Sequence, residues 1–260
     1  MQTTIKTMIR ATLTSGRVKS SLRVALAAGG FTTFLATLAH AELISGQLAG
    51  FEHLRNPVWT EAKEPSKHGY TFRELVPTVP AKFRHLFPHI PKELCVAALA
   101  ADKQAPKPAV LIRVGGGRTT PVTIVVTPKT KLIFRNTDPF THRLFAVGLK
   151  TFVANDTARG AEREWSVPEV GSFEIRDELA PSLRMFVVSK PNVAAIGYPS
   201  MDGKFALTVK EPGDYQVQAF FAGKPVGPSL PISVDGKDVL IRGPIKVADP
   251  PKKQKQKGKE

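Results

Sequence analysis

One stretch of the chain decides the fold, because a strand, a turn and a histidine follow one another in it: Ile133-Phe134-Arg135-Asn136-Thr137-Asp138-Pro139-Phe140-Thr141-His142-Arg143-Leu144-Phe145. Leu132 and Phe134 alternate with residues 131, 133 and 135, which is the period of a strand rather than of a helix. The Asn-x-Asp-Pro run that follows favours a turn, since Asn and Asp side chains bond local backbone and Pro presets φ. The pattern predicts that this turn holds His142 at the end of a β-structure.

A second stretch of the same kind lies at residues 173–188. A strand is predicted over 173–176 and an apolar run over 185–188, and between them stands the segment Asp177-Glu178-Leu179-Ala180-Pro181-Ser182-Leu183-Arg184. Short strands separated by turns at intervals of about 8–12 residues favour a Greek-key sandwich. We therefore expect an all-β fold.

Together the two stretches resemble the cupredoxins, and especially the bacterial periplasmic cupredoxin-like proteins related to methylamine-utilisation proteins. In that family an Asn-x-Asp-x-x-x-His segment supplies the first copper histidine, which corresponds to His142. A Cys-x-x-His-x-x-Met segment supplies the other ligands. The resemblance covers about residues 118–222 and implies a Greek-key cupredoxin-like sandwich in which His142 lies near the loop of residues 177–183.

The same resemblance implies that the copper ligands are largely lost. Asp177 stands at the cysteine position, Ala180 at the position of the second histidine and Leu183 at that of the methionine. A blue-copper site needs a thiolate and two imidazoles, so we expect no metal site and no cofactor. Copper remains the alternative, and its candidate ligands are His142, Asp177 and Met185.

Residues 201–221 carry a different signature, DG-x-F-x-L followed by PG-x-Y-x-V-x-A. The Asp-Gly pair favours a tight turn, and the pattern resembles the prealbumin-like domains of carboxypeptidase regulatory regions. In the cupredoxin-like family such a unit can be split by the copper domain, which would pair residues 43–51 and 93–100 with residues 193–221. The expected organisation is a signal peptide at 1–41, N-terminal strands with a Pro- and aromatic-rich loop at 42–108 that pack with 193–248, the cupredoxin-like sandwich at 109–192, prealbumin-like strands at 193–248 and a disordered basic tail at 249–260.

The two ends of the chain hold most of its positive charge. The 260 residues include 37 Lys and Arg against 22 Asp and Glu, a net charge of +15. Residues 1–41 combine a basic start, an apolar core over 24–38 and an Ala-His-Ala site, which is typical of a signal peptide cleaved after Ala41. The mature protein is then periplasmic or secreted and begins at Glu42. The basic tail, which cannot form a core, is a candidate contact for an anionic surface through Lys252, Lys253, Lys255, Lys257 and Lys259.

Several smaller features guide the remaining expectations. Cys95 is the single cysteine, so no intrachain disulfide forms, and its apolar surroundings predict a buried side chain. The triple glycine at 115–117 lacks the Lys-Ser/Thr of a phosphate loop and predicts a turn. A helical turn is expected over 154–160. Four phenylalanines are expected to share one core: Phe134, Phe145, Phe173 and Phe186.

Two classes of function follow from these patterns. The favoured one is a non-catalytic exported β-sandwich, a binding or structural module of the cell envelope, because no nucleophile–base pair, paired-carboxylate motif or nucleotide loop is present. Its partner is an unknown protein or an anionic envelope polymer, with weak membrane-surface contact through the tail and no nucleic acid. The alternatives are a divergent copper protein for electron transfer or copper carriage, and an enzyme that uses Asp138, His142, Asp177 and Glu178 for acid–base chemistry.

Overall fold

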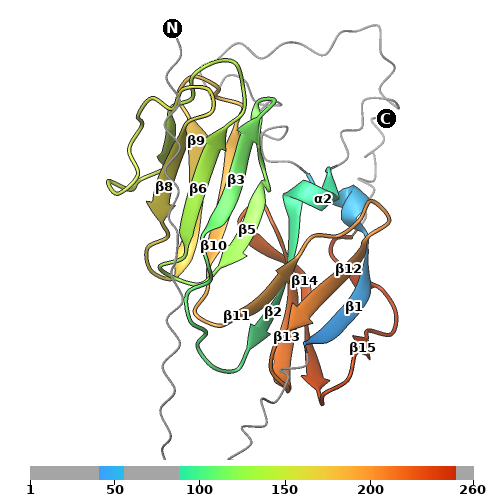
Figure 1. The fold of residues 1–260 in the computed structure, drawn as a ribbon. Coiled ribbons are helices and arrows are strands. Elements are labelled where there is room, and N and C mark those ends of the chain that lie inside the picture. The colour runs from blue at the N-terminus through green and yellow to red at the C-terminus, as the bar shows by residue number, and fades with distance from the viewer. Residues whose placement is uncertain (1–40, 56–87, 250–260) are drawn as a thin grey trace, which may run out of the picture. The chain divides into compact units, whose positions relative to one another are not determined.

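The computed structural model describes residues 41–55 and 88–249 of the chain. Nearly all its regular structure is β (Figure 1), which confirms the expected all-β fold. The helical elements are the 3-10 turn η1 (Phe51–His53) and the single turn α2 (Ile90–Glu93). The strands are β1 (Glu42–Ala49), β2 (Leu94–Ala100), β3 (Val110–Gly115), β4 (Arg118–Thr120), β5 (Thr123–Val126), β6 (Lys131–Asn136), β7 (Leu144–Ala146), β8 (Glu162–Ser166), β9 (Gly171–Asp177), β10 (Arg184–Ser189), β11 (Val193–Gly197), β12 (Lys204–Val209), β13 (Gly213–Phe221), β14 (Lys224–Val234), β15 (Val239–Leu240) and β16 (Ile245–Lys246).

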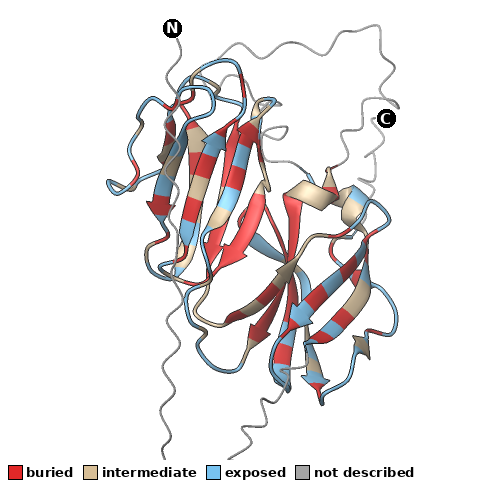
Figure 2. Cartoon of the chain, in the orientation of Figure 1, coloured by how far each residue is buried: buried red, intermediate tan, exposed pale blue. Residues whose placement is uncertain are grey.

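Two four-stranded sheets, β4-β3-β6-β8 and β5-β10-β9-β7, enclose one hydrophobic core. Strand β6 shows how the alternation works, since Leu132 and Phe134 are fully buried while Lys131 and Arg135 face solvent (Figure 2). Each sheet contains one parallel pair, β3 with β6 and β5 with β10. Since parallel neighbours cannot be joined by a tight hairpin, the chain crosses between the sheets, as in a Greek-key sandwich.

A second pair of sheets encloses a separate core and is assembled from distant parts of the chain. One sheet has the order β12-β1-β15 with β16 also on β1, and the other has the order β11-β2-β13-β14. Strand β1 pairs antiparallel with β12, and strand β2 pairs antiparallel with β13. Strands β1 and β2 therefore come before residues 110–189, which form the first sandwich, but they pair with strands that come after those residues.

Strand β2 is buried on both of its faces. Its even-numbered residues join the core with β1 and β12, while Cys95, Ala97 and Leu99 form another apolar cluster with Val125, Val188, Val193 and Phe220. Strands buried on both faces read as continuous apolar runs, which explains the sequence Leu-Cys-Val-Ala-Ala-Leu-Ala. Cys95 is fully buried, as expected, and burial raises the pKa of its thiol to about 12.

Two sequence expectations about the first sandwich are wrong. Phe134 and Phe173 pack in the core of the first sandwich, but Phe145 and Phe186 are only partly buried and lie on the opposite faces of β7 and β10. Their neighbours along each strand, such as Leu144 and Met185, point into that core instead. Residues 154–160 form no helical turn, because Thr157 makes an isolated β-bridge with His142.

Other expectations concern residues outside the described ranges. The signal peptide falls on residues 1–40, most of the Pro- and aromatic-rich loop on 56–87, and the basic tail on 250–260. Within the described residues no helix has the length and apolar character needed to cross a membrane.

Candidate functional site

The turn after strand β6 is built around the buried side chain of Asn136. Its Nδ2 donates to the carbonyl oxygens of Phe140, at 2.7 Å, and Thr157, at 2.8 Å. Its Oδ1 accepts the backbone N–H of Asp138 at 2.8 Å. This is the local Asx bonding that makes Asn a turn former. These bonds shape the turn so that Asp138 and His142 lie within hydrogen-bond distance of each other.

His142 is fully buried, and each of its ring nitrogens faces a carboxylate. Nδ1 lies 2.5 Å from Oδ2 of Asp177, and Nε2 lies 3.1 Å from Oδ2 of Asp138. The ring also lies against that of Phe140, with centroids 4.9 Å apart. Both ring nitrogens are therefore engaged by carboxyl oxygens, and the imidazole is held between Asp138 and Asp177.

Asp177, at the end of β9, anchors the following loop as well as the histidine. Its Oδ1 accepts the backbone N–H groups of Leu179, at 2.7 Å, Ala180, at 3.1 Å, and Arg143, at 3.2 Å. The side chain of Asp177 is completely buried. A buried carboxylate is stable when it is paired and fully hydrogen-bonded, and Asp177 meets both conditions.

Asp138 links the histidine to the glycine turn between β3 and β4. Its Oδ1 accepts the backbone N–H of Gly116 at 2.8 Å. This bond is the main cause that lowers the pKa of Asp138, and His142 lowers it further, while burial acts in the opposite direction. Gly115 allows the close approach, because a Cβ there would lie 2.3 Å from Oγ1 of Thr137. The predicted turn is thus tied to the His142 loop.

The residues at the copper-ligand positions do not fit a copper site. A histidine binds a metal through a nitrogen lone pair, and both His142 nitrogens are used by carboxylates. Ala180 and Leu183 offer no donor atom, and Met185 lies in the hydrophobic core opposite Ile175. Within residues 41–55 and 88–249, no group of three or more His, Cys, Asp or Glu side chains is arranged to hold a metal ion.

The enzyme residues considered above are only partly brought together. Asp138, His142 and Asp177 form one buried cluster, whereas Glu178 is half exposed and lies 4.0 Å from the guanidinium of Arg143. The structure brings Asp138 and Asp177 to opposite edges of one imidazole; the sequence placed both carboxylates at the same end as His142, but not one on each ring nitrogen.

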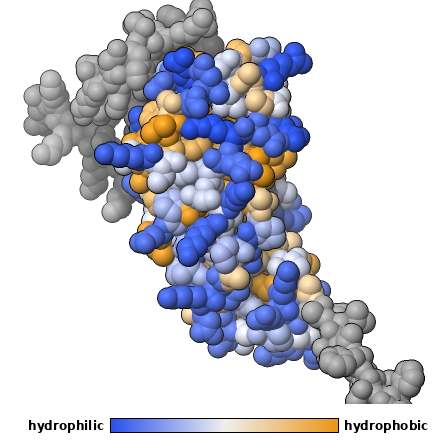
Figure 3. All heavy atoms as spheres, turned by 60° about the vertical axis from the view of Figure 1, so that its left-hand side comes forward, coloured by the Kyte–Doolittle hydropathy of each residue, from blue (hydrophilic) through white to orange (hydrophobic). Residues whose placement is uncertain are grey.

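The surface over this cluster presents two apolar side chains. Phe140 is 50% exposed and Leu179 is 52% exposed. Phe140 lies against His142, and the N–H of Leu179 is bonded to Asp177, so the same buried pair positions both residues. Charged side chains border them, since Arg143 pairs with Asp156 and approaches Glu178. Seen from one side, the molecule's surface is mostly hydrophilic with separate small apolar areas (Figure 3).

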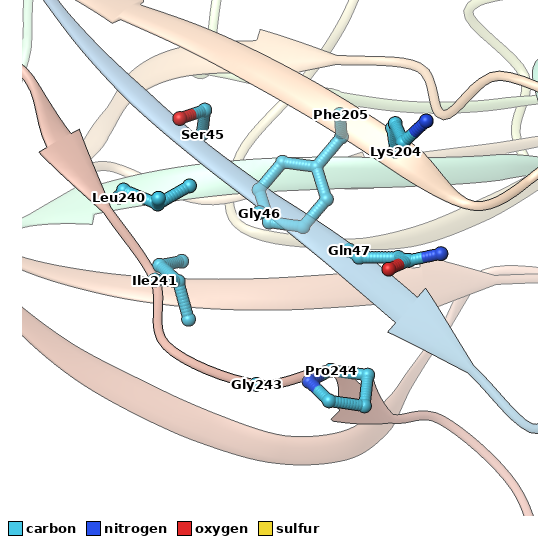
Figure 4. Close-up of a pocket in the computed structure, with 9 residues that line it drawn as sticks. All are labelled: Ser45, Gly46, Gln47, Lys204, Phe205, Leu240, Ile241, Gly243 and Pro244. Atoms are coloured by element: carbon cyan, nitrogen blue, oxygen red, sulfur yellow. The ribbon is translucent and has the colours of Figure 1, made fainter.

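A shallow pocket of about 300 Å³ lies elsewhere, between β1, β12 and the segment that contains β15. Figure 4 shows the ring of Phe205 lying across Gly46, and a Cβ on Gly46 would be 2.9 Å from that ring. The one ionisable residue of its lining, Lys204, is paired with Asp202 at 2.8 Å. The lining contains no histidine, cysteine or carboxylate.

No protein-family model matches the chain, and no curated protein matches it in sequence. Among solved structures it is similar to a purple cupredoxin from Nitrosopumilus maritimus, with 16% identity and a TM-score of 0.29 over 31% of this chain and 99% of that one. It is also similar to amicyanin from Paracoccus versutus, with 16% identity and a TM-score of 0.29 over 38% of this chain and 99% of that one. Likenesses at this level say nothing about the site, so its chemistry is derived from the chain's own contacts.

Proposed function

We propose that the chain is a non-catalytic, exported β-sandwich protein that binds a protein partner of the cell envelope through the end where His142 lies. The observation that carries the proposal is the burial of His142 with both ring nitrogens engaged by Asp138 and Asp177. In this arrangement the histidine supports a surface and takes no part in chemistry.

The contacts of His142 argue against the two alternative roles. General acid–base catalysis needs a group within hydrogen-bond reach of a substrate, and His142 has no exposed surface. Copper binding would require breaking the bonds to both carboxyl groups and leaving two buried acidic side chains without their partner, which is costly. The cupredoxin-like frame is then a scaffold in which a hydrogen-bonded His–Asp pair stands at the former metal position.

The exposed residues over the cluster fit the core of a protein interface. Interfaces combine a central apolar or aromatic contact with a polar rim, and energetically dominant residues are often aromatic. Phe140 and Leu179 supply the apolar contact, and the charged pair Arg143–Asp156 lies beside them. Because buried hydrogen bonds fix both loops, the surface loses little conformational entropy when it binds.

The test compares the mature protein with two variants in affinity purification from the envelope fraction. The Phe140→Ser, Leu179→Ser double variant removes the apolar pair. Val170→Ser is the matched control, because Val170 is 60% exposed but lies between β8 and β9, at the opposite end of the sandwich. We expect one partner to be retained by the native protein and the control, and to be lost by at least tenfold from the double variant.

Metal analysis of the same native sample tests the copper alternative. Stoichiometric copper in the native protein, with or without an intense visible thiolate-to-copper band, would overturn the proposal. Equal retention of the partner by the double variant would also overturn it.

A further inference from the structure

The segment that joins β2 to β3 holds a partly buried lysine beside a second positive charge (Figure 1). The Nζ of Lys107 donates to the carbonyl oxygen of Ala194, near the start of β11, at 2.6 Å. Burial is the main cause that lowers the pKa of this amine, and the charge of Lys210 lowers it further. Two ammonium groups therefore lie close enough to repel each other, and one of them is partly removed from water.

A third lysine adjoins this segment in an unfavourable backbone conformation. The backbone N–H of Lys107 bonds to the hydroxyl oxygens of Thr127, at 3.2 Å, and Thr130, at 3.4 Å, so the turn of residues 127–130 lies against the same segment. Lys129 is the third residue of that turn and has a φ of 65°, a conformation for which Gly or Asn is usual. Residues held in such conformations cluster at functional sites.

No acidic side chain neutralises these charges. A fourth lysine stands on the same segment, and the set is called the lysine patch: Lys103, Lys107, Lys129 and Lys210. Within residues 41–55 and 88–249, none of the four forms an ion pair with a carboxylate, although Asp102 and Glu211 are their neighbours in sequence. All but Lys107 are exposed. The patch therefore presents an excess of positive charge to solvent.

We propose that the lysine patch binds a linear anionic polymer whose charges are carboxylate or phosphate groups. An anion laid across the patch would offset the repulsion between Lys107 and Lys210. Lysine is a compact charge on a flexible stem, whereas the arginine fork suits one planar anion in a fixed geometry, so a patch built from lysines alone fits charges that repeat along a chain. The patch offers no aromatic side chain for stacking on bases, so we expect a polymer other than nucleic acid.

This surface is separate from the one proposed for a protein partner. The turn of residues 127–130 precedes β6, whereas His142 follows it. The lysine patch therefore lies at the other end of that strand from His142, and a polymer on the patch leaves Phe140 and Leu179 free.

The experiment measures the affinity of the mature protein for labelled polygalacturonate, a carboxylate polymer, and for labelled polyphosphate. The stronger of the two identifies the anion. We expect the Lys129→Glu, Lys210→Glu double variant to weaken binding at least about tenfold at low salt, and the control described below to weaken it less than about threefold.

The matched control is the Lys150→Glu, Lys224→Glu double variant, which changes the net charge by the same amount. Both control lysines are exposed. Lys150 lies between β7 and β8, and Lys224 lies in the hairpin next to Leu94, the first residue of β2, whereas the lysine patch adjoins the segment after its last residue. Residues 250–260 are the same in every chain, so their lysines do not affect the comparison.

Lysine acetylation of the native protein, read by mass spectrometry, locates the bound polymer without any substitution. The polymer should slow acetylation of Lys103, Lys129 and Lys210 and leave Lys150 and Lys224 unchanged. The proposal is overturned if the native protein binds neither polymer, if both double variants weaken binding equally, or if all five lysines are protected alike. None of these measurements involves Phe140, Leu179 or a protein partner, so their failure is distinguishable from a failure of the proposed function.

Discussion

At the residue scale, the buried histidine and its two carboxylates explain the end of the first sandwich. His142 joins three segments through hydrogen bonds: its own turn, the loop after β9 and, through Asp138, the glycine turn between β3 and β4. In such a network, each member is expensive to remove, because the remaining charges stay buried without partners. The network therefore ties these three segments together at this end of the sandwich.

The pKa of Asp138 gives a testable pH dependence. It is lower in the folded protein than its ordinary value, mainly because of the Gly116 amide, so its stabilising effect is present above the unfolded value, about 3.9. The effect is lost as the pH falls through the lower folded value. We expect Asp138→Asn to lower the free energy of unfolding by about 1–3 kcal/mol at pH 7, and the difference from wild type to shrink below about pH 4.

Urea unfolding measured between pH 3 and pH 7 checks this expectation. The control is Asp214→Asn, because Asp214 is exposed on β13 and a surface change of this kind usually alters stability by less than about 0.5 kcal/mol. A pH-independent loss in Asp138→Asn would mean that the carboxylate charge is unimportant there.

At the element scale, the period of a strand is visible in the sequence but the face that it buries is not. Phe134 is fully buried on β6, whereas Phe145 on β7 is only partly buried. Strand β7 has three residues, and Leu144 and Ala146 occupy its core face. Strands β10 and β5 are covered on both faces, so apolar residues stand at successive positions. The sequence then has no apolar–polar alternation that would show which face of the strand points into the sandwich core.

This difference predicts unequal effects of the same substitution. Phe134→Ala removes a fully buried ring that stacks on Phe152, with centroids 5.3 Å apart. We expect it to lower the free energy of unfolding by about 3–5 kcal/mol. Phe145→Ala is the matched control and should cost clearly less, since its ring keeps contact with water. Chemical denaturation of both variants measures the two losses, and similar values would contradict the assigned faces.

At the scale of the whole molecule, the uneven distribution of charge suggests a second contact. Five of the lysines lie in residues 252–260 with one acidic residue. We propose that this tail binds weakly to anionic surfaces, because each lysine near an anionic bilayer contributes about 1 kcal/mol. The attraction is electrostatic, so salt should weaken it as the Debye length falls from about 10 Å at 0.1 M to about 3 Å at 1 M.

Sedimentation with anionic vesicles tests this proposal. The mature protein should sediment with the vesicles at low salt and be released at high salt, while a chain ending at Pro251 should stay in solution under both conditions. Equal binding of the two chains, unaffected by salt, would assign the tail no role beyond solubility.

Local patterns in the sequence were sufficient for the all-β class, most strand positions and the turn at Asn136. These features depend on short-range effects: alternation over a few residues, the φ of proline and the bonding of Asn and Asp side chains to nearby backbone. The Asp at position 177 also indicates, against the cupredoxin pattern, that no thiolate stands at that position.

The tertiary structure alone decided the partners of these residues. That Asp177 reaches His142 and that Asp138 reaches Gly116 both depend on segments brought together from distant parts of the chain. The pairing of strands that are distant in sequence and the burial of both faces of β2 follow from long-range packing. Neither can be predicted from the periodicity of residues within one strand. The environment of His142 is therefore completed by Asp177, which lies 35 residues away in sequence.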